Sequence, residues 1–221
     1  MLRFSDRLLL GISFFIPSAP FPPKARGRRG FDEWRQAKSA KDWLSTDIGY
    51  PRRSGRLQRF EDGKIFAVDG GGADVWNKAC EFQFVHKIQE GDGTIIAQVI
   101  GLQHSDPWSK AGLMFRENLL PDSPNIFLTA TAENGVSFQW RDTPGAESES
   151  IKRPDLNYPC WLRLERKGNT FIGSHSPDGK TWAEIGRHDT VMSENVSIGL
   201  GVTSHNTETY SVAEFENVST E

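Results

Sequence analysis

The sequence predicts an all-β protein, a two-sheet antiparallel β-sandwich, and three observations support this. Apolar and polar residues alternate with a period of two, as they do through Thr94–Val99. Dipeptides that favour tight turns, such as Asp92-Gly93 and Asn134-Gly135, separate these runs. A helical period is almost missing from Leu44 onwards. Roughly a dozen short strands at this spacing are typical of a sandwich or barrel and exclude a parallel α/β fold.

Length and composition set the limits of the prediction. A chain of 221 residues with 37% hydrophobic residues can bury a full core, so one domain is predicted over residues 44–221. A formal net charge of -3 excludes general nucleic-acid binding, which depends on clustered Lys and Arg. Two alternatives remain for Cys80 and Cys160: they pair, or they stay as separate buried thiols. No motif for a metal or cofactor is found.

Residues 1–43 are predicted to form a leader and linker. Arg3 and Arg7 precede the apolar run Leu8–Ile16, and prolines follow. This order resembles a secretory signal peptide, and the run is too short to span a membrane. One alternative is export to the cell surface or beyond; the other is a leader outside the domain and a cytoplasmic protein. A short helix is predicted over Phe31–Trp43.

The strands are predicted in order from Leu57, with the acidic, Pro-containing segment Asp142–Pro159 as a surface loop. The strands are Leu57–Phe60, Lys64–Val68, Cys80–Ile88, Thr94–Leu102, Lys110–Glu117, Ile126–Thr131, Val136–Arg141, Trp161–Arg166, Thr170–Ser174, Thr181–Gly186, Val196–Thr203 and Tyr210–Phe215. Residues two apart on a strand share a face, so the face that carries the apolar residues is predicted to lie in the core. The residues expected between the sheets are Phe82, Phe84, Val99, Leu113, Phe115, Phe138, Trp140, Leu162, Leu164 and Leu200.

Six segments together resemble one known family, the concanavalin A-like lectin/glucanase modules that include a yeast regulator of enolase. The segments are Asp47–Gly49, Gly70–Trp76, Gly91–Val99, Asp106–Glu117, Trp161–Phe171 and Ser176–Trp182. The resemblance covers about Leu44–Val218 and implies a jelly roll of two curved antiparallel sheets. It implies little about a ligand, because fold alone does not fix function. Cys80 stands where an acidic residue is expected in such modules.

The sequence shows no catalytic pattern. Glycosidases of this fold carry two carboxylates on one strand face in an E-x-D-x-E motif, and this motif is not found. Glu147 and Glu149 are two apart but lie in the predicted loop. Asp69, Asp74 and Asp92 are read as turn carboxylates and not as a calcium site. The protein is therefore predicted not to be an enzyme.

Five residues are the candidates for a binding site. Trp76 and Trp108 lie in loops or at strand ends, where indole faces can contact a sugar ring. The strand faces opposite the predicted core carry Arg116, Gln139 and Arg141, whose side chains offer hydrogen bonds to hydroxyl groups. The alternatives are that the two indoles close the ends of the sandwich, and that the polar face is merely solvated.

These observations lead to three hypotheses for function. The first is a non-catalytic carbohydrate-binding or cell-surface recognition module, with a glycan as partner. The alternative is a protein-interaction or regulatory module of metabolism, with a protein as partner; a glycoside hydrolase is a third and weaker reading. Neither nucleic acid nor a membrane span is expected.

Overall fold

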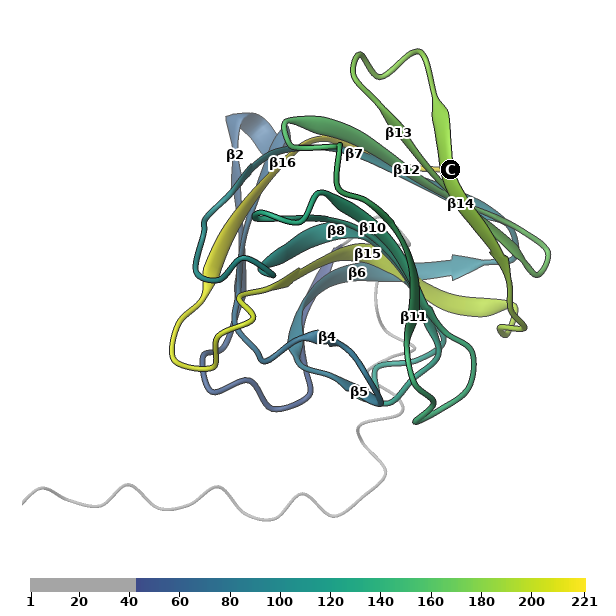
Figure 1. Cartoon of the computed structure of the whole chain (residues 1–221), viewed down its shortest axis with the longest axis horizontal. Helices are drawn as coiled ribbons and strands as arrows, with labels where there is room; N and C mark the ends of the chain where they lie inside the picture. Colours follow the sequence, from purple (N-terminus) through teal and green to yellow (C-terminus); the bar gives the residue numbers. More distant parts are fainter. Residues whose placement is uncertain (1–42) are drawn as a thin grey trace, which may run out of the picture. The chain divides into compact units, whose positions relative to one another are not determined.

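The computed structural model describes residues 43–221, which form two stacked seven-stranded antiparallel sheets (Figure 1). The leader predicted over residues 1–43, and the helix within it, lie outside the described residues except for Trp43. Cys80 and Cys160 are both buried and free, so the reading as separate thiols is confirmed. Within residues 43–221 there is no helix with the length and apolar character needed to cross a membrane.

Both sheets are built from segments that lie far apart in the sequence. In spatial order the first sheet contains β1 (Leu44–Ile48), β6 (Phe82–Glu90), β15 (Asn195–Thr203), β8 (Lys110–Arg116), β9 (Asn125–Thr131), β10 (Val136–Arg141) and β11 (Glu149–Arg153). The second sheet contains β14 (Ala183–Asp189), β13 (Thr170–Ser176), β12 (Cys160–Lys167), β7 (Gly93–Leu102), β16 (Ser211–Thr220), β3 (Ile65–Gly70) and β2 (Arg56–Phe60). A short 3-10 helix, η2 (Glu61–Gly63), joins β2 to β3, and β4 (Val75–Trp76) pairs with β5 (Ala79–Cys80) as a separate hairpin.

The main hydrophobic core fills the space between the two sheets. Leu113 and Phe115 on β8 lie in this core with no exposed surface, as do Leu162 and Leu164 on β12. Their spacing of two places each pair on one face of its strand. Val99, Phe138 and Leu200 are in the same core, and Trp140 packs against it while half-buried. The predicted phase is therefore confirmed for these strands.

The predicted phase of β6 is wrong. Phe82 and Phe84 are fully buried, but they belong to a second cluster with Met114 and Phe127, whereas Val85 occupies the core between the sheets. The second cluster lies on the face of the first sheet that is turned away from the second sheet, called here the outer face. Hairpin β4–β5 covers part of this face through Val75 and Cys80. Both faces of β6 are buried near its start, and the more apolar face, with Phe82 and Phe84, is the one turned away from the core, so alternation indicated the wrong face.

One predicted surface loop contains a strand. Residues Glu149–Arg153 form β11, an edge strand paired with β10, so Glu149 does not lie in a loop. The strand is mostly exposed and has a single apolar residue, Ile151, which explains why its sequence shows no alternation. Its position matters for function, because it borders the outer face of the first sheet.

Candidate functional site

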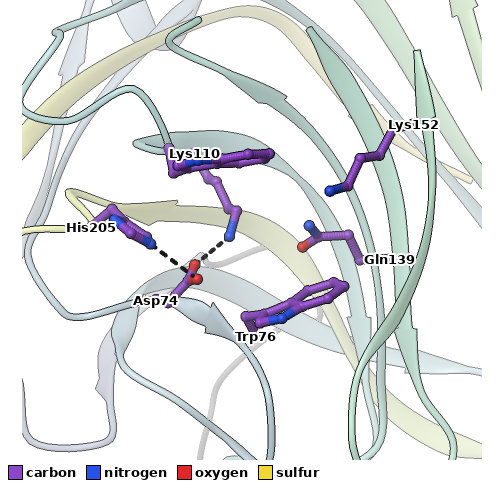
Figure 2. Close-up of a pocket in the computed structure, with 7 residues that line it drawn as sticks. Asp74, Trp76, Lys110, Gln139, Lys152 and His205 are labelled. Carbon is purple, nitrogen blue, oxygen red and sulfur yellow. Dashed lines mark hydrogen bonds and ion pairs between the residues drawn. The ribbon is translucent and has the colours of Figure 1, made fainter. Parts of the chain in front are cut away.

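A pocket of about 270 Å³ lies on the outer face of the first sheet (Figure 2). Its wall is contributed by hairpin β4–β5, by the loops before β8 and after β15, and by the strands β8, β10 and β11. The residues that line it are Asp74, Trp76, Trp108, Lys110, Gln139, Lys152 and His205. Three of the five predicted site residues, Trp76, Trp108 and Gln139, are thus brought together in one pocket.

The sharp bend before β4 positions Asp74 and Trp76. Gly72 has a φ of 113°, and a Cβ atom there would lie 2.0 Å from the carbonyl oxygen of Glu81. Only glycine accommodates this conformation and this approach of two backbones. The bend directs the chain into the hairpin, in which Trp76 pairs with Ala79. The triple glycine thus acts as the tight bend expected from the sequence.

Hydrogen bonds within its loop hold Trp108 in place. The carboxylate of Asp106 accepts a 2.8 Å hydrogen bond from the backbone N–H of Trp108. The backbone N–H of Ser109 donates to the carbonyl of Asp106 at 2.9 Å, and the side chain of Asn134 donates to the carbonyl of Pro107 at 2.9 Å. The loop is therefore a defined turn, and the indole of Trp108 belongs to a fixed wall of the pocket.

Asp74, Lys110 and His205 form a charged network at one end of the pocket (Figure 2). The ammonium group of Lys110 donates to Asp74, and the Nε2 atom of His205 lies 3.3 Å from the same carboxylate. The Nδ1 atom of His205 lies 3.0 Å from Asp106. Lys110 is only 2% exposed, and its burial lowers the pKa of its ammonium group, while the charge of Asp74 opposes that change. The carboxylate of Asp74 is thus already shared by two partners.

Strand β10 presents two polar atoms that lack partners within residues 43–221. The Oε1 atom of Gln139 and the hydroxyl of Ser137 are buried and form no hydrogen bond. Both residues lie on the outer-face side of β10, and Gln139 lines the pocket while 3% exposed. In native proteins nearly all buried polar atoms have a partner, so these two atoms are available to water or to a ligand in the pocket.

The expectation that Arg116 and Arg141 present exposed side chains is wrong. Both residues are fully buried, and neither lines the pocket. Arg141 donates to the carbonyl oxygens of Asn77, at 2.7 Å, and Trp76, at 3.1 Å. Arg116 donates to the carbonyl of Leu120. The hairpin and the loop after β8 cover this part of the outer face. Side chains of the first sheet that point away from the main core are therefore buried beneath the hairpin and this loop.

The pocket also contains residues that sequence reasoning missed. Lys110, Lys152 and His205 are not among the sequence candidates, and Asp74 is considered there only as a turn carboxylate or a calcium ligand. Lys110 shares the phase of Met114 and Arg116 on β8, so the strand pattern could have indicated it. Lys152 and His205 lie on an exposed edge strand and a loop, whose sequences carry no comparable signal.

The metal-site reading of the carboxylates also finds no support among residues 43–221. Asp69 pairs with Arg56, Asp74 pairs with Lys110, and Asp92 accepts a hydrogen bond from the backbone N–H of Gly168. The three carboxylates therefore act in separate places, each with a nitrogen donor. Asp69 lies within strand β3, so the expectation that it is a turn carboxylate is wrong.

Comparison with known proteins establishes the fold. No family model and no curated protein matches the sequence. A functionally unknown protein from Saccharomyces cerevisiae is similar in structure, with a TM-score of 0.60 and 14% identity over 80% of this chain and 95% of its own. The carbohydrate-binding module CBM66 from Bacillus subtilis has a TM-score of 0.51 and 18% identity over 80% of this chain and 94% of its own.

A third similar structure is the GH43 protein BlXynB from Bacillus licheniformis. Its TM-score is 0.52 and its identity 12%, over 68% of this chain and 31% of its own length. These likenesses, with the two antiparallel sheets, define the fold as a β-sandwich jelly roll. At such identities the similarity describes the fold and not the ligand.

Proposed function

We propose that this chain is a non-catalytic carbohydrate-binding module and that the pocket beside hairpin β4–β5 is its binding site. The observation that carries the proposal is the unpartnered Oε1 atom of Gln139, whose amide points into the space beside Trp76 (Figure 2). A buried polar atom without a partner costs about 1–3 kcal/mol. A sugar hydroxyl would donate to this atom and so keep it satisfied when the ligand displaces water from the pocket.

The two indoles suit a sugar ring. Trp76 and Trp108 are both half-buried, so each keeps part of its flat apolar surface at the pocket. Aromatic faces bury the C–H surface of a pyranose, while a few polar groups fix its orientation. A pocket volume of about 270 Å³ is small for a ligand site and fits one or two sugar rings better than a long chain lying in a groove. The fold shared with the module CBM66 agrees with this role.

The carboxylate count supports binding without hydrolysis. Glycosidases use two carboxyl groups that flank the scissile bond. Among the described residues that line the pocket, Asp74 is the single carboxylate, and Lys110 and His205 already engage it. Asp106 faces His205 and the backbone of Trp108 and does not line the pocket. Neither group is placed as a free acid or base for a glycosidic bond.

A glycan array probed with the full chain tests the proposal. We expect saturable binding to one class of glycan, and we expect Trp76→Ala and Gln139→Ala to weaken that binding at least tenfold. Trp182→Ala is the matched control, since this tryptophan is also half-buried but lies outside the pocket, beneath Arg163. Each variant is first compared by thermal denaturation, so that lost binding is not confused with lost fold.

Two outcomes would overturn the proposal. One is equal loss of binding in the Trp182 control, which would show that the indoles of the pocket have no special role. The other is binding to no glycan while the wild-type chain retains a protein partner, which would favour the regulatory alternative.

A further inference from the structure

The pocket contains a cation that its own carboxylate does not neutralise. Lys152 is exposed on β11, and its ammonium nitrogen lies 4.9 Å from the ring centroid of Trp108. Within residues 43–221 no acidic side chain forms an ion pair with it. Figure 2 shows this ammonium group pointing into the same space as the side chains of Gln139 and Trp76.

Among the side chains that line the pocket, ammonium groups outnumber carboxylates. Lys110 and Lys152 contribute two ammonium groups, and Asp74 contributes one carboxylate. Asp74 is held by Lys110 and His205 at the far end of the network. The charge of Lys152 also lowers the pKa of Lys110, which places the two cations within electrostatic reach of each other. A negative group between Lys152 and Lys110 would relieve this repulsion.

The backbone fixes where the cation lies. Register in the first sheet sets Lys152 opposite Ser137 and Gln139 opposite Ser150, on the outer-face side. The ammonium group and the unpartnered Gln139 amide are therefore contributed by adjacent strands at neighbouring positions. Stacking on the face of Trp108 also limits the freedom of the Lys152 side chain.

We propose that the ligand of this pocket is an acidic saccharide, a sugar residue whose carboxylate or sulfate group is held by Lys152 while a hydroxyl group donates to Gln139. The inference rests on the proposed carbohydrate-binding function and specifies its ligand class. A ligand of this kind would pair with both groups, the cation and the buried acceptor. A neutral sugar satisfies only the acceptor.

Paired sugars that differ in one charged group test the inference with the full chain. Galacturonic acid and galactose 6-sulfate are compared with galactose by calorimetry or by ligand-observed NMR, beside a glycan array that carries neutral, carboxylated and sulfated glycans. We expect an acidic member to bind about tenfold more tightly than its neutral partner, as for one hydrogen bond to a charged group. The carboxylate and sulfate arms distinguish the two sources of charge.

Salt and a matched variant isolate the role of Lys152. Raising the ionic strength from about 0.01 M to about 1 M shortens the Debye length from about 30 Å to about 3 Å, so the acidic preference should shrink. Lys152→Gln should abolish the preference for the acidic sugar over its neutral partner. Lys180→Gln removes the same charge from an exposed turn between β13 and β14, and it should leave the preference intact.

The outcomes separate the two proposals. Equal affinity for acidic and neutral sugars, or a preference that persists in Lys152→Gln, overturns the acidic-ligand inference and leaves carbohydrate binding in place. Binding to no glycan of any charge overturns both. An acidic preference lost only in the Lys152 variant supports the inference.

Discussion

The guanidinium group of Arg141 donates a 2.7 Å hydrogen bond to the carbonyl oxygen of Asn77, the residue that follows Trp76. This bond joins strand β10 to the hairpin that forms one wall of the pocket, across 64 residues of chain. The same guanidinium also donates to the carbonyl of Trp76 at 3.1 Å. A buried cation therefore fixes the position of an indole that the proposed ligand contacts.

Replacing Arg141 should damage both stability and binding. Arg141→Met introduces an apolar side chain of similar length, which leaves the carbonyl of Trp76 without the guanidinium donor and the carbonyl of Asn77 with only the hydroxyl of Ser148. Hydrogen bonds to charged groups contribute about 1.5–3 kcal/mol, so we expect a loss of unfolding free energy near the top of that range. Urea denaturation measures it. Arg187→Met, an exposed arginine on β14, is the control and should leave the denaturation midpoint unchanged; equal effects of both variants would contradict the assigned role.

Asp74 and Lys110 should behave as one unit. Asp74→Asn removes the charge that compensates the buried ammonium group of Lys110. Breaking a buried ion pair costs about 3–5 kcal/mol, and we expect roughly 2–3 kcal/mol here because Asp74 is partly exposed. The double variant with Lys110→Met should recover much of this loss. A double-mutant cycle with no coupling energy would contradict the pairing.

His86 should make stability fall in mild acid. Burial lowers the pKa of His86 from 6.5 to about 4, so the folded protein keeps it neutral where the unfolded chain is protonated. The stability that neutral His86 contributes is therefore fully present above about pH 6.5. As the pH falls towards 4, the free energy of unfolding decreases by roughly 3 kcal/mol at most. His86→Phe keeps a ring to stack on Phe84 and removes the titration. Urea denaturation at about pH 7.5 and about pH 4.5 should show a smaller acid-induced loss in the variant than in the wild type; equal losses would contradict this assignment.

Gly72 should be far less replaceable than Gly145. Both have positive φ angles, 113° and 71°, but only at Gly72 would a Cβ atom meet backbone, 2.0 Å from the carbonyl of Glu81. Gly145→Ala should cost about 1 kcal/mol from conformation alone, while Gly72→Ala should cost roughly 3 kcal/mol or more because the backbones must also separate. Thermal denaturation ranks the two variants. Weakened glycan binding in the Gly72 variant alone would connect the bend to the pocket, and equal stability of the two would contradict this account.

The sequence predicted the architecture because the core between the sheets obeys simple alternation. Leu113, Phe115, Leu162 and Leu164 lie where a period of two places them. The phase of β6 could not be predicted in the same way, because Phe82 and Val85 are buried on opposite faces. Alternation identifies a buried face only when the other face meets water.

The site was predicted in part for a related reason. Trp76, Trp108 and Gln139 stood out by residue type, and they share the pocket. Arg116 and Arg141 have suitable chemistry as well, yet the hairpin covers them. A residue on the outer face of the sheet can contact a ligand or be buried under a loop, depending on which loop packs over it. Such packing is a long-range contact and has no local sequence signal. Lys152 and His205 were missed because tertiary contacts alone bring an edge strand and a loop to the pocket.

The anchoring of the hairpin by Arg141 has a consequence for the kinetics of recognition. A wall that is already ordered before a ligand arrives loses little conformational entropy on binding, so the free energy of each contact is retained as affinity. Association then needs no loop closure, and its rate is set by diffusion and orientation and not by a slow rearrangement of the protein. Complexes at this pocket should therefore form in a single fast phase, and differences in affinity among sugars should be found in how long each one remains bound.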